Sequence, residues 1–442
     1  MPVLAAVAVG LTLFAAPAAP APITPVTSAS VGTQVAPAAF DPAATPQANR
    51  ATITVTAQAA GTLQVDVVTA GGIVVAALLP PTAVTAGQMQ TLTWDGAGVP
   101  DGHYAVRARL TDAAGAVQEA LTPVTRDGAD PVVTASAPAP AVTARGPVRV
   151  RATAADLSGA TGMRLVVESQ LGVEIGTVKM PAPVDGASEL AWNLRVKGRL
   201  LLPGVYRLRV MADDAVGRRG QGEAHLLRVE RAVTSTQIYR LPEAGAKVAL
   251  TFDDCLDTGP WLQLLTALRK ARVKATFFCN GVNVRSNPEA ARRTVEDGHT
   301  IGSHTWAHPW MTKKAAGEQR SQIRGDREIW WSVAKASPAP FFRPPYGDVD
   351  AGVRASAGAE GMAWTVLWDV DPSDYLKPPV GVLVDRVVSK ARPGSIVVMH
   401  VEATTAAAVP GMVRGLRAQG LEPVSLDELF GRASYLSRAR RG

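Results

Sequence analysis

The chain has 442 residues, of which 47% are hydrophobic and 19% are charged, a balance that excludes an intrinsically disordered polymer. Its 45 basic and 38 acidic side chains give a net charge of +7, but no basic run is interleaved with aromatic residues, so nucleic-acid binding is not expected. Attraction to an anionic cell wall or membrane surface is the milder interpretation of this charge. A chain of this length has room for about two to four domains.

The first segment, residues 1–22, is apolar and is followed by small residues and prolines, as in a secretory signal peptide. It lacks a basic n-region, so a retained anchor remains an alternative, although the apolar run is short for a membrane span. We therefore predict a secreted or cell-envelope-associated protein. Residues 23–50, rich in Ala, Pro, Thr and Val, are predicted to form a flexible or extended linker.

Two stretches of short alternating runs follow, at residues 51–127 and 131–233, and each predicts a small β-sandwich. The second repeats the first, because Gly102, Tyr104, Asp112 and Gly115 recur 102 residues later as Gly204, Tyr206, Asp214 and Gly217. Both copies are similar to the bacterial immunoglobulin-like modules found beside extracellular enzymes. The Trp and Tyr of each copy could bind sugars, but we expect them in the buried core.

Residues 246–431 have a different sequence pattern, in which short apolar segments typical of strands alternate with amphipathic segments typical of helices. Strands are predicted at 248–254 and 273–281, and helices at 260–272, at 287–298 and near 315–336. About seven strands predict a parallel, incomplete or deformed (β/α)7-type barrel, whose chemistry is expected at the carboxyl ends of the strands. The overall prediction is a multidomain chain of two β-sandwiches and a barrel, ending in a basic tail at residues 432–442.

Three potential metal ligands follow predicted strands in the barrel region. Asp254 ends the strand "VALTFDD", and "HTWAH" supplies His304 and His308 four residues apart, on one turn of helix or in a tight loop. Two imidazoles and one carboxylate leave coordination positions free, as a hydrolytic metal requires. Asp253 is then spare, and beside a cation it stays ionised and is a candidate general base.

Other polar residues lie at later strand ends. "FFRPPYG" delivers Arg343, whose guanidinium can hold a carboxylate bidentately and so orient the base. His400 ends "SIVVMH", where a core histidine is the alternative interpretation. The segment "WDVDPSDY" offers Asp369, Asp371 and Asp374, one of which could pair with His400 and keep it protonated as a general acid.

The segments "TFDDC", "HTWAH", "RPPY", "DPSDY" and "VVMH" resemble, in order and spacing, the five motifs of the polysaccharide deacetylases, the NodB-type domains of carbohydrate esterase family 4. The resemblance implies a divalent metal, usually zinc, on Asp254, His304 and His308. It further implies Asp253 as base, Arg343 as its orienting partner, and His400 as acid tuned by Asp374. Water at the metal attacks the acetyl group of an N-acetylated sugar, and the backbone N–H of Tyr346 helps to hold the oxyanion.

The sequence departs from the family pattern at three positions. Cys255 replaces the usual Gly of the first motif, Tyr375 replaces the usual Trp of the fourth, and Val401 replaces the usual Asp after the last His. None removes a catalytic group, but the first two are expected to reshape the sugar pocket, with Tyr375 among its substrate contacts. Cys255 and Cys279 are either linked in an oxidising compartment or two small residues filling space.

The leading hypothesis is an exported metal-dependent N-deacetylase acting on an acetylated polysaccharide such as peptidoglycan or chitin, near the cell wall or a membrane surface. An O-acetyl esterase of the xylan type on the same fold is the enzymatic alternative. A catalytically inactive cell-wall-binding protein is the alternative from another class, although such a protein has no need to keep Asp253, Arg343 and His400 together.

Overall fold

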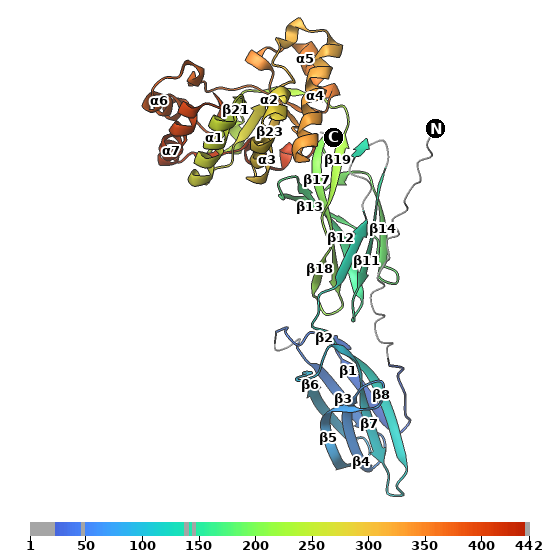
Figure 1. The fold of residues 1–442 in the computed structure, drawn as a ribbon. Helices are drawn as coiled ribbons and strands as arrows, with labels where there is room; N and C mark the ends of the chain where they lie inside the picture. The colour runs from blue at the N-terminus through green and yellow to red at the C-terminus, as the bar shows by residue number, and fades with distance from the viewer. Residues whose placement is uncertain (1–22, 46–48, 137–140, 144–146, 438–442) are drawn as a thin grey trace, which may run out of the picture.

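The computed structural model describes residues 23–45, 49–136, 141–143 and 147–437. Figure 1 shows three units arranged end to end: two that consist of strands, and a third in which helices surround a sheet. The predicted signal peptide or anchor, residues 1–22, lies outside the described residues. Within the described part of the chain, no helix has the length and hydropathy needed to cross a membrane.

The first unit contains two sheets around one core. One sheet has the order β1–β3–β6, formed by Val31–Ala36, Ala51–Ala57 and Met89–Trp94. The other has the order β2–β8–β7–β4–β5, formed by Ala39–Phe40, Val117–Arg126, Gly102–Thr111, Gly61–Val68 and Val74–Val84. Alternate residues of these strands point inward, and Val55, Val65 and Val106 of both sheets are buried in one cluster.

The predicted linker at residues 23–50 is wrong for residues 31–40. Strand β1 pairs with β3 along its whole length, and β2 lies parallel to β8. Val31 and Phe40 are buried in the core of the first unit. The high Ala and Pro content of this segment obscured a period-2 pattern in "VGTQVA", whose first residue is buried and whose next is exposed.

The second unit repeats this arrangement. Its smaller sheet has the order β14–β11–β9, formed by Ala187–Trp192, Val148–Ala155 and Val132–Ser136. Its larger sheet has the order β10–β19–β17–β12–β13, with β18 beside β17, formed by Ala141–Thr143, His225–Glu230, Gly204–Asp214, Ala160–Ser169, Glu174–Lys179 and Arg219–Gln221. A short hairpin, β15 and β16, joins Arg195–Val196 to Arg199–Leu200.

The aromatic residues of the repeat lie in the two cores, as the sequence predicted. Tyr104 donates its hydroxyl hydrogen bond to the Pro100 carbonyl at 2.7 Å, and Tyr206 donates to the Leu202 carbonyl at 2.6 Å. The partner is four residues upstream in both copies. Trp94 and Trp192 are also buried. These rings therefore stabilise the units and are not exposed for sugar binding.

The third unit is built on an eight-stranded sheet with the order β20–β25–β24–β23–β22–β21–β26 and with β27 beside β21. The strands, in that order, are Thr236–Ile238, Trp364–Val366, Phe341–Phe342, Thr300–Ser303, Thr276–Cys279, Lys247–Asp254, Ile396–His400 and Glu422–Val424. All their ladders are parallel. Strand β20 precedes the predicted boundary at residue 246, which adds one strand to the expected seven.

The sheet is a parallel half-barrel. No ladder among the described residues joins β20 to β26, and isolated bridges at Arg240–Ser395 and Val370–Val397 lie beside this opening. The eight helices of this unit in the described chain are α1 to α8, at Thr258–Ala271, Gly281–Ser286, Pro288–Glu296, Ala316–Ala334, Ala351–Ala359, Val380–Lys390, Ala403–Ala418 and Leu426–Phe430. Short 3-10 helices lie at Pro242–Ala244, Met311–Lys313, Pro345–Gly347, Asp374–Leu376 and Gly431–Ser434.

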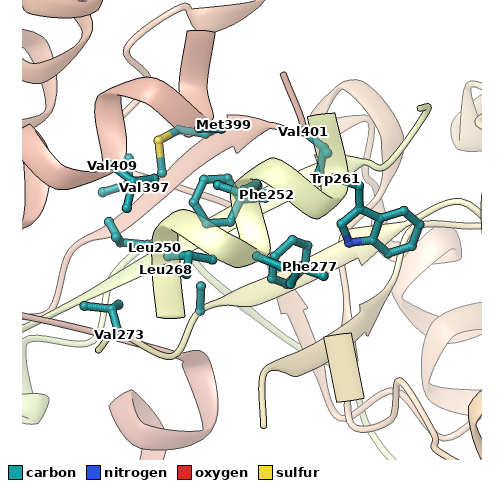
Figure 2. Close-up of a cluster of buried hydrophobic side chains, with 14 of the residues drawn as sticks. Leu250, Phe252, Trp261, Leu268, Val273, Phe277, Val397, Met399, Val401 and Val409 are labelled. Carbon is teal, nitrogen blue, oxygen red and sulfur yellow. The ribbon is translucent and has the colours of Figure 1, made fainter. Parts of the chain in front are cut away.

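Helix α1 shows how the sequence positions this sheet. Its buried residues Trp261, Leu264, Leu265 and Leu268 recur at helical spacing, so one face of the helix is apolar. Figure 2 shows Trp261 and Leu268 in a cluster with side chains of β21, β22 and β26, including Phe252. This packing fixes the strands whose carboxyl ends carry the candidate site.

The predicted basic tail at residues 432–442 is wrong for its first half. Tyr435 and Leu436 are buried in the core of the second unit. The Leu202 N–H donates to the Tyr435 carbonyl at 2.7 Å, and the Ser437 N–H donates to the Leu200 carbonyl at 2.8 Å. The segment therefore joins the third unit to the second, while residues 438–442 lie outside the described residues.

Candidate active site

The predicted site residues gather where parallel strands end. Asp253 and Asp254 are the last residues of β21, and the parallel register places Asp253 opposite His400, the last residue of β26. His304 directly follows β23, and Arg343 directly follows β24. Neighbouring parallel strands thus bring residues almost 150 positions apart in the sequence to one edge of the sheet.

The backbone turns sharply at the end of β21. Asp254 and Cys255 have φ angles of 72° and 61°, in the left-handed region that favours glycine. Cys255 forms a disulfide with Cys279, the last residue of β22, which settles the open question about the two cysteines. The cross-link joins the two strand ends beside the candidate metal ligands. The side chain of Cys255 thus occupies a backbone conformation that favours glycine.

Asp254, His304 and His308 form a group of potential metal ligands. The Asp254 Oδ1 atom lies 3.5 Å from His304 Nε2 and 3.3 Å from His308 Nε2. This oxygen is buried and has no hydrogen-bond partner among the described residues. The "HTWAH" segment is a loop in which Thr305 and His308 have φ angles of 69° and 58°, so the loop alternative holds and the helical one does not.

The tautomer of His304 follows from its other ring nitrogen. His304 Nδ1 lies 2.8 Å from the Arg343 carbonyl, which only accepts, so Nδ1–H donates and a neutral ring leaves a lone pair on Nε2. A lone pair directed at a carboxylate oxygen is unfavourable unless a cation lies between them. The orphaned Asp254 oxygen and the two imidazole nitrogens therefore fit a divalent metal of the type that binds nitrogen and oxygen ligands.

The carboxyl group of Asp254 is kept ionised in this setting. Burial alone raises its pKa, but the neighbouring imidazoles, His304 more than His308, outweigh burial and lower the pKa to about 2. Burial lowers the pKa of His308, and its neighbour His304 lowers it further. Both shifts favour charge states that bind a metal: an anionic Asp254 carboxylate and a neutral His308 imidazole.

Asp253 is buried beside a fully buried guanidinium. Arg343 donates from Nη1 to Asp253 Oδ1 at 2.6 Å and to Thr251 Oγ1 at 2.8 Å, and its Nε donates to the Val366 carbonyl at 3.2 Å. The guanidinium therefore holds Asp253 through one nitrogen, and the predicted bidentate pair is not formed. Asp253 Oδ2 remains 3.9 Å from His304 Nε2, facing the ligand group.

His400 pairs with Asp374, in the short helix η4 (Asp374–Leu376). His400 Nδ1 lies 2.9 Å from Asp374 Oδ1, while Asp374 Oδ2 accepts from the His400 N–H at 2.7 Å and from Thr405 Oγ1 at 2.8 Å. Burial lowers the pKa of His400, but the hydrogen bond to Asp374 and the charges of Asp253 and Asp374 outweigh it and raise the pKa to about 9. His400 is therefore an imidazolium near neutral pH.

The other two carboxylates of "WDVDPSDY" have different partners. Asp369 accepts from Ser395 Oγ at 3.0 Å and from the Ile396 N–H at 2.9 Å, at the amino end of β26, whereas His400 ends that strand. Asp371 accepts from the Ser373 N–H at 2.6 Å. Of the three alternatives, the structure places Asp374 against His400.

Exposed aromatic rings lie beside the two histidine groups. Tyr346 contacts the His308 ring edge-on at 4.5 Å between centroids, and it stacks on Trp310 at 4.2 Å. Tyr375 lies edge-on to His400 at 5.9 Å. The φ angle of Tyr346 is 60°, and none of the hydrogen bonds between described residues uses its N–H. That N–H is thus available as a donor at the site.

Sequence reasoning missed several residues that support the site. Trp310 was not singled out, although it lies two positions after His308. Thr251 and Thr405 bind Arg343 and Asp374, and Asn280 Nδ2 donates to the His304 carbonyl at 2.7 Å. Trp310 could have been found from the motif it follows. The two threonines and Asn280 carry no local signal, because only the fold brings them to their partners.

Comparison with known proteins matches this part of the chain. The sequence profile described as polysaccharide deacetylase matches residues 241–364. A peptidoglycan-N-acetylglucosamine deacetylase of Bacillus cereus is 32% identical over 211 residues, which are 46% of this chain and 98% of that protein. The chain belongs to the polysaccharide deacetylase family. The resemblance in the five motifs is thereby confirmed at the level of the family and its NodB-type domain.

Other similar proteins are longer or only distantly superimposable. The peptidoglycan-N-acetylglucosamine deacetylase PgdA of Listeria monocytogenes is 35% identical over 201 residues, 45% of this chain and 42% of that protein. The chain thus spans about two fifths of the length of the first relatives it matches. A solved family 4 carbohydrate esterase pseudoenzyme from Bacillus anthracis is 30% identical, with a TM-score of 0.43, covering 45% of this chain and 70% of that chain.

Proposed function

We propose that this polysaccharide deacetylase is an exported, metal-dependent enzyme that hydrolyses acetyl groups from N-acetylglucosamine units of a cell-wall polymer, peptidoglycan or a chitin-like chain. One observation carries the proposal. The metal-ligand group, Asp253 and the His400–Asp374 pair lie together at the ends of β21, β23 and β26. A binding protein without activity needs no such set of charge states at one edge of its sheet.

The residues that would hold the metal are Asp254, His304 and His308. Two imidazoles and a carboxylate favour zinc. A bound divalent cation supplies Lewis acidity that acidifies a water molecule and polarises the acetyl carbonyl. Arg343 and Asn280 contribute indirectly by orienting His304. The Arg343 carbonyl accepts from His304 Nδ1–H, and the Asn280 side chain donates to the His304 carbonyl.

Asp253 is the proposed general base. Arg343 holds its Oδ1, so Oδ2 is the oxygen that can accept the proton of the attacking water. The water oxygen bonds to the acetyl carbon, and the carbonyl oxygen becomes an oxyanion. The Tyr346 N–H, which has a left-handed backbone conformation and no other acceptor among the described residues, is the proposed protein donor to that oxyanion.

His400 is the proposed general acid. Its Nδ1–H binds Asp374, so the remaining proton on Nε2 is the one that can be transferred. It protonates the sugar nitrogen as the carbon–nitrogen bond breaks, and acetate and a glucosamine unit leave. Because Asp374 keeps the imidazolium charged, the site holds a base and an acid in opposite protonation states at the same pH.

The proposal extends to the whole chain. The two strand-rich units, residues 31–127 and 131–233, are proposed to be immunoglobulin-like sandwiches that present the catalytic unit, residues 236–431, to the wall. The Cys255–Cys279 disulfide supports export, because disulfides persist in oxidising compartments. The net charge of +7 supports a location close to an anionic wall or membrane surface.

Acetate release from N-acetylglucosamine oligomers and from purified peptidoglycan tests the proposal. Protein treated with a chelator is expected to release no acetate, and added zinc is expected to restore release. Asp253→Asn is expected to be inactive with zinc, whereas Asp371→Asn, a matched change in a carboxylate away from His400, is expected to retain activity. Equal release by chelated and zinc-restored protein would refute metal dependence, and no release from either polymer would refute the function.

A further inference from the structure

A second group of carboxylates lies at the junction of the two strand-rich units, far from the active site in Figure 1. Asp127, Asp156 and Asp214 each direct one oxygen to a region where the three atoms lie within 4.8 Å of one another. Asp127 directly follows β8 of the first unit, Asp156 follows β11, and Asp214 ends β17 of the second unit. We call these three residues the junction cluster.

The junction cluster has two buried members and a partly buried one, Asp156, and it lacks a balancing side-chain cation among the described residues. Asp127 and Asp214 are 0% and 4% exposed. No Lys, Arg or His among the described residues forms an ion pair with any of the three carboxylates. The Arg218 guanidinium, which lies in the same turn as Asp214, binds Asp41 and Asp130 instead, at 2.8 and 2.9 Å. Two buried anions beside a third, partly buried one, without a counter-charge, are unfavourable.

The internal repeat shows which contacts of Asp214 belong to its turn and which feature the turn does not explain. In the first unit, Asp112 occupies the equivalent turn, where its Oδ1 accepts from the Ala114 and Ala116 N–H groups. In the second unit, Asp214 Oδ1 accepts from the Val216 and Arg218 N–H groups in the same way. Asp112 is exposed, however, while Asp214 is buried. Turn stabilisation therefore explains Oδ1 of Asp214 but not its burial among other carboxylates.

The second oxygen of Asp214 is the independent sign of a missing partner. Its Oδ2 atom is buried and has no hydrogen-bond partner among the described residues. Because Oδ1 is committed to the turn, Oδ2 is the oxygen left to face the cluster. Asp156 reflects the same crowding, since burial raises its pKa and the charges of Asp127 and Asp214 raise it further against the opposing hydrogen bond from Ser158.

We propose that the junction cluster is a calcium site. Its donors are oxygens only, with no imidazole or thiolate in the group, which is the preference of a hard cation. Three carboxylates drawn from separate loops suit the flexible coordination of Ca²⁺ better than the strict octahedron of Mg²⁺, which retains most of its waters. Because Asp127 belongs to the first unit and the other two residues to the second, the cation would link the units.

The link agrees with the hydrogen bonds already present at the junction. The Ser158 N–H lies 3.0 Å from Asp127 Oδ2 and 3.0 Å from Asp156 Oδ1, so one donor of the second unit contacts carboxylates of both. Arg218 adds ion pairs to Asp41 of the first unit and to Asp130 between the units. A bound cation would offset the repulsion that otherwise opposes this contact.

Calcium titration of the full chain tests the site. Zinc is first supplied in one equivalent to fill the active-site ligands, and Ca²⁺ binding is then followed by calorimetry, together with the midpoint of thermal unfolding. We expect one Ca²⁺ per chain and a higher unfolding midpoint with Ca²⁺. Asp214→Asn keeps the turn acceptor but removes the charge, and it should weaken Ca²⁺ binding by about tenfold or more. Asp156→Asn should do the same.

Asp112→Asn is the matched control, because it changes the equivalent turn of the first unit and should leave Ca²⁺ binding unchanged. Absence of Ca²⁺ binding at millimolar concentration, or equal binding by wild type and Asp214→Asn, would overturn the proposal. An unfolding midpoint that rises on acidification but not with Ca²⁺ would also overturn it, because the carboxylates would then share protons. A response to Mg²⁺ as large as that to Ca²⁺ would overturn the choice of calcium.

Discussion

Two histidines of the candidate site differ in the group that accepts the Nδ1 proton. His304, after β23, donates its Nδ1–H to the neutral carbonyl of Arg343, whereas His400, at the end of β26, donates to the carboxylate of Asp374. The carbonyl accepts the Nδ1–H without adding charge, which leaves Nε2 of His304 to face the carboxylate of the candidate metal group. The carboxylate stabilises the imidazolium and raises the pKa of His400 to about 9.

A third histidine shows what burial does without such a partner. His299 accepts a hydrogen bond on Nδ1 from the Ala275 N–H at 3.1 Å, and burial lowers its pKa to about 4. His299 is therefore a buried core histidine, the type of residue that was the alternative interpretation for His400. The three rings differ in the group at Nδ1: a carboxylate raises the pKa of buried His400, whereas His299, with a backbone N–H there, keeps the low pKa that burial gives it.

The largest expected effect comes from removing His304, the first histidine of the comparison. His304→Ala deletes one imidazole of the metal group, so metal content and acetate release should both fall to background. Metal analysis and an acetate assay check this. His299→Ala is the control for loss of a buried imidazole, and it should retain the metal. Full activity of His304→Ala with normal metal content would contradict the assignment.

The next largest effect concerns Asp253, the proposed general base. Asp253→Asn keeps the size of the side chain and its contact with Arg343 but cannot accept the proton, so kcat should fall by about 10²–10⁴-fold. The metal content should stay unchanged, because Asp253 is not in the ligand group. A variant that retained more than a tenth of the activity on the same substrate would exclude Asp253 as the base.

The acid side can be changed without removing the histidine. Asp374→Asn removes the negative charge beside His400, so the pKa of His400 should fall and the alkaline limb of the kcat–pH profile should move to lower pH. The sign follows because the acid must be protonated, and activity is lost as pH rises through the pKa of His400. A metal cation in the site lowers this pKa, so in the loaded enzyme the wild-type limb should lie below about 9.

The same shift has a consequence for stability. The folded pKa of His400 is raised from 6.5 to about 9, so its stabilising contribution is complete below 6.5 and is lost as pH rises through about 9. Asp374→Asn should therefore be less stable than wild type mainly below pH 6.5, and the difference should disappear as pH rises through about 9. If the alkaline limb of the variant coincided with that of the wild type, Asp374 would not tune the acid.

The smallest predicted effect concerns the exposed rings. Trp310 stacks on Tyr346 at the edge of the ligand side, so Trp310→Ala should raise KM for an oligosaccharide by about two- to tenfold and leave kcat nearly unchanged. Trp310→Phe keeps a ring and should lie between the two. A fall in kcat without a change in KM would show that the stack positions Tyr346 rather than substrate.

The sequence predicted which residues gather at the candidate site, because most of them follow apolar strands and the carboxyl ends of parallel strands meet. The fold of the third unit was predicted for the same reason, apart from β20. The segment at residues 31–40 and the buried Tyr435 were missed, because their partners are distant in the sequence and their composition resembles that of linkers and tails. The single-nitrogen contact of Arg343 depends on Thr251 and Val366, which no motif connects.

Nitrogen NMR of the histidine side chains near neutral pH tests the central comparison most directly. The account predicts that His304 carries a proton on Nδ1, and that metal-free His400 carries protons on both nitrogens and titrates near 9. In Asp374→Asn, the His400 signals should move to those of a neutral ring at lower pH. A neutral His400 at pH 7 in the wild-type protein would contradict the account.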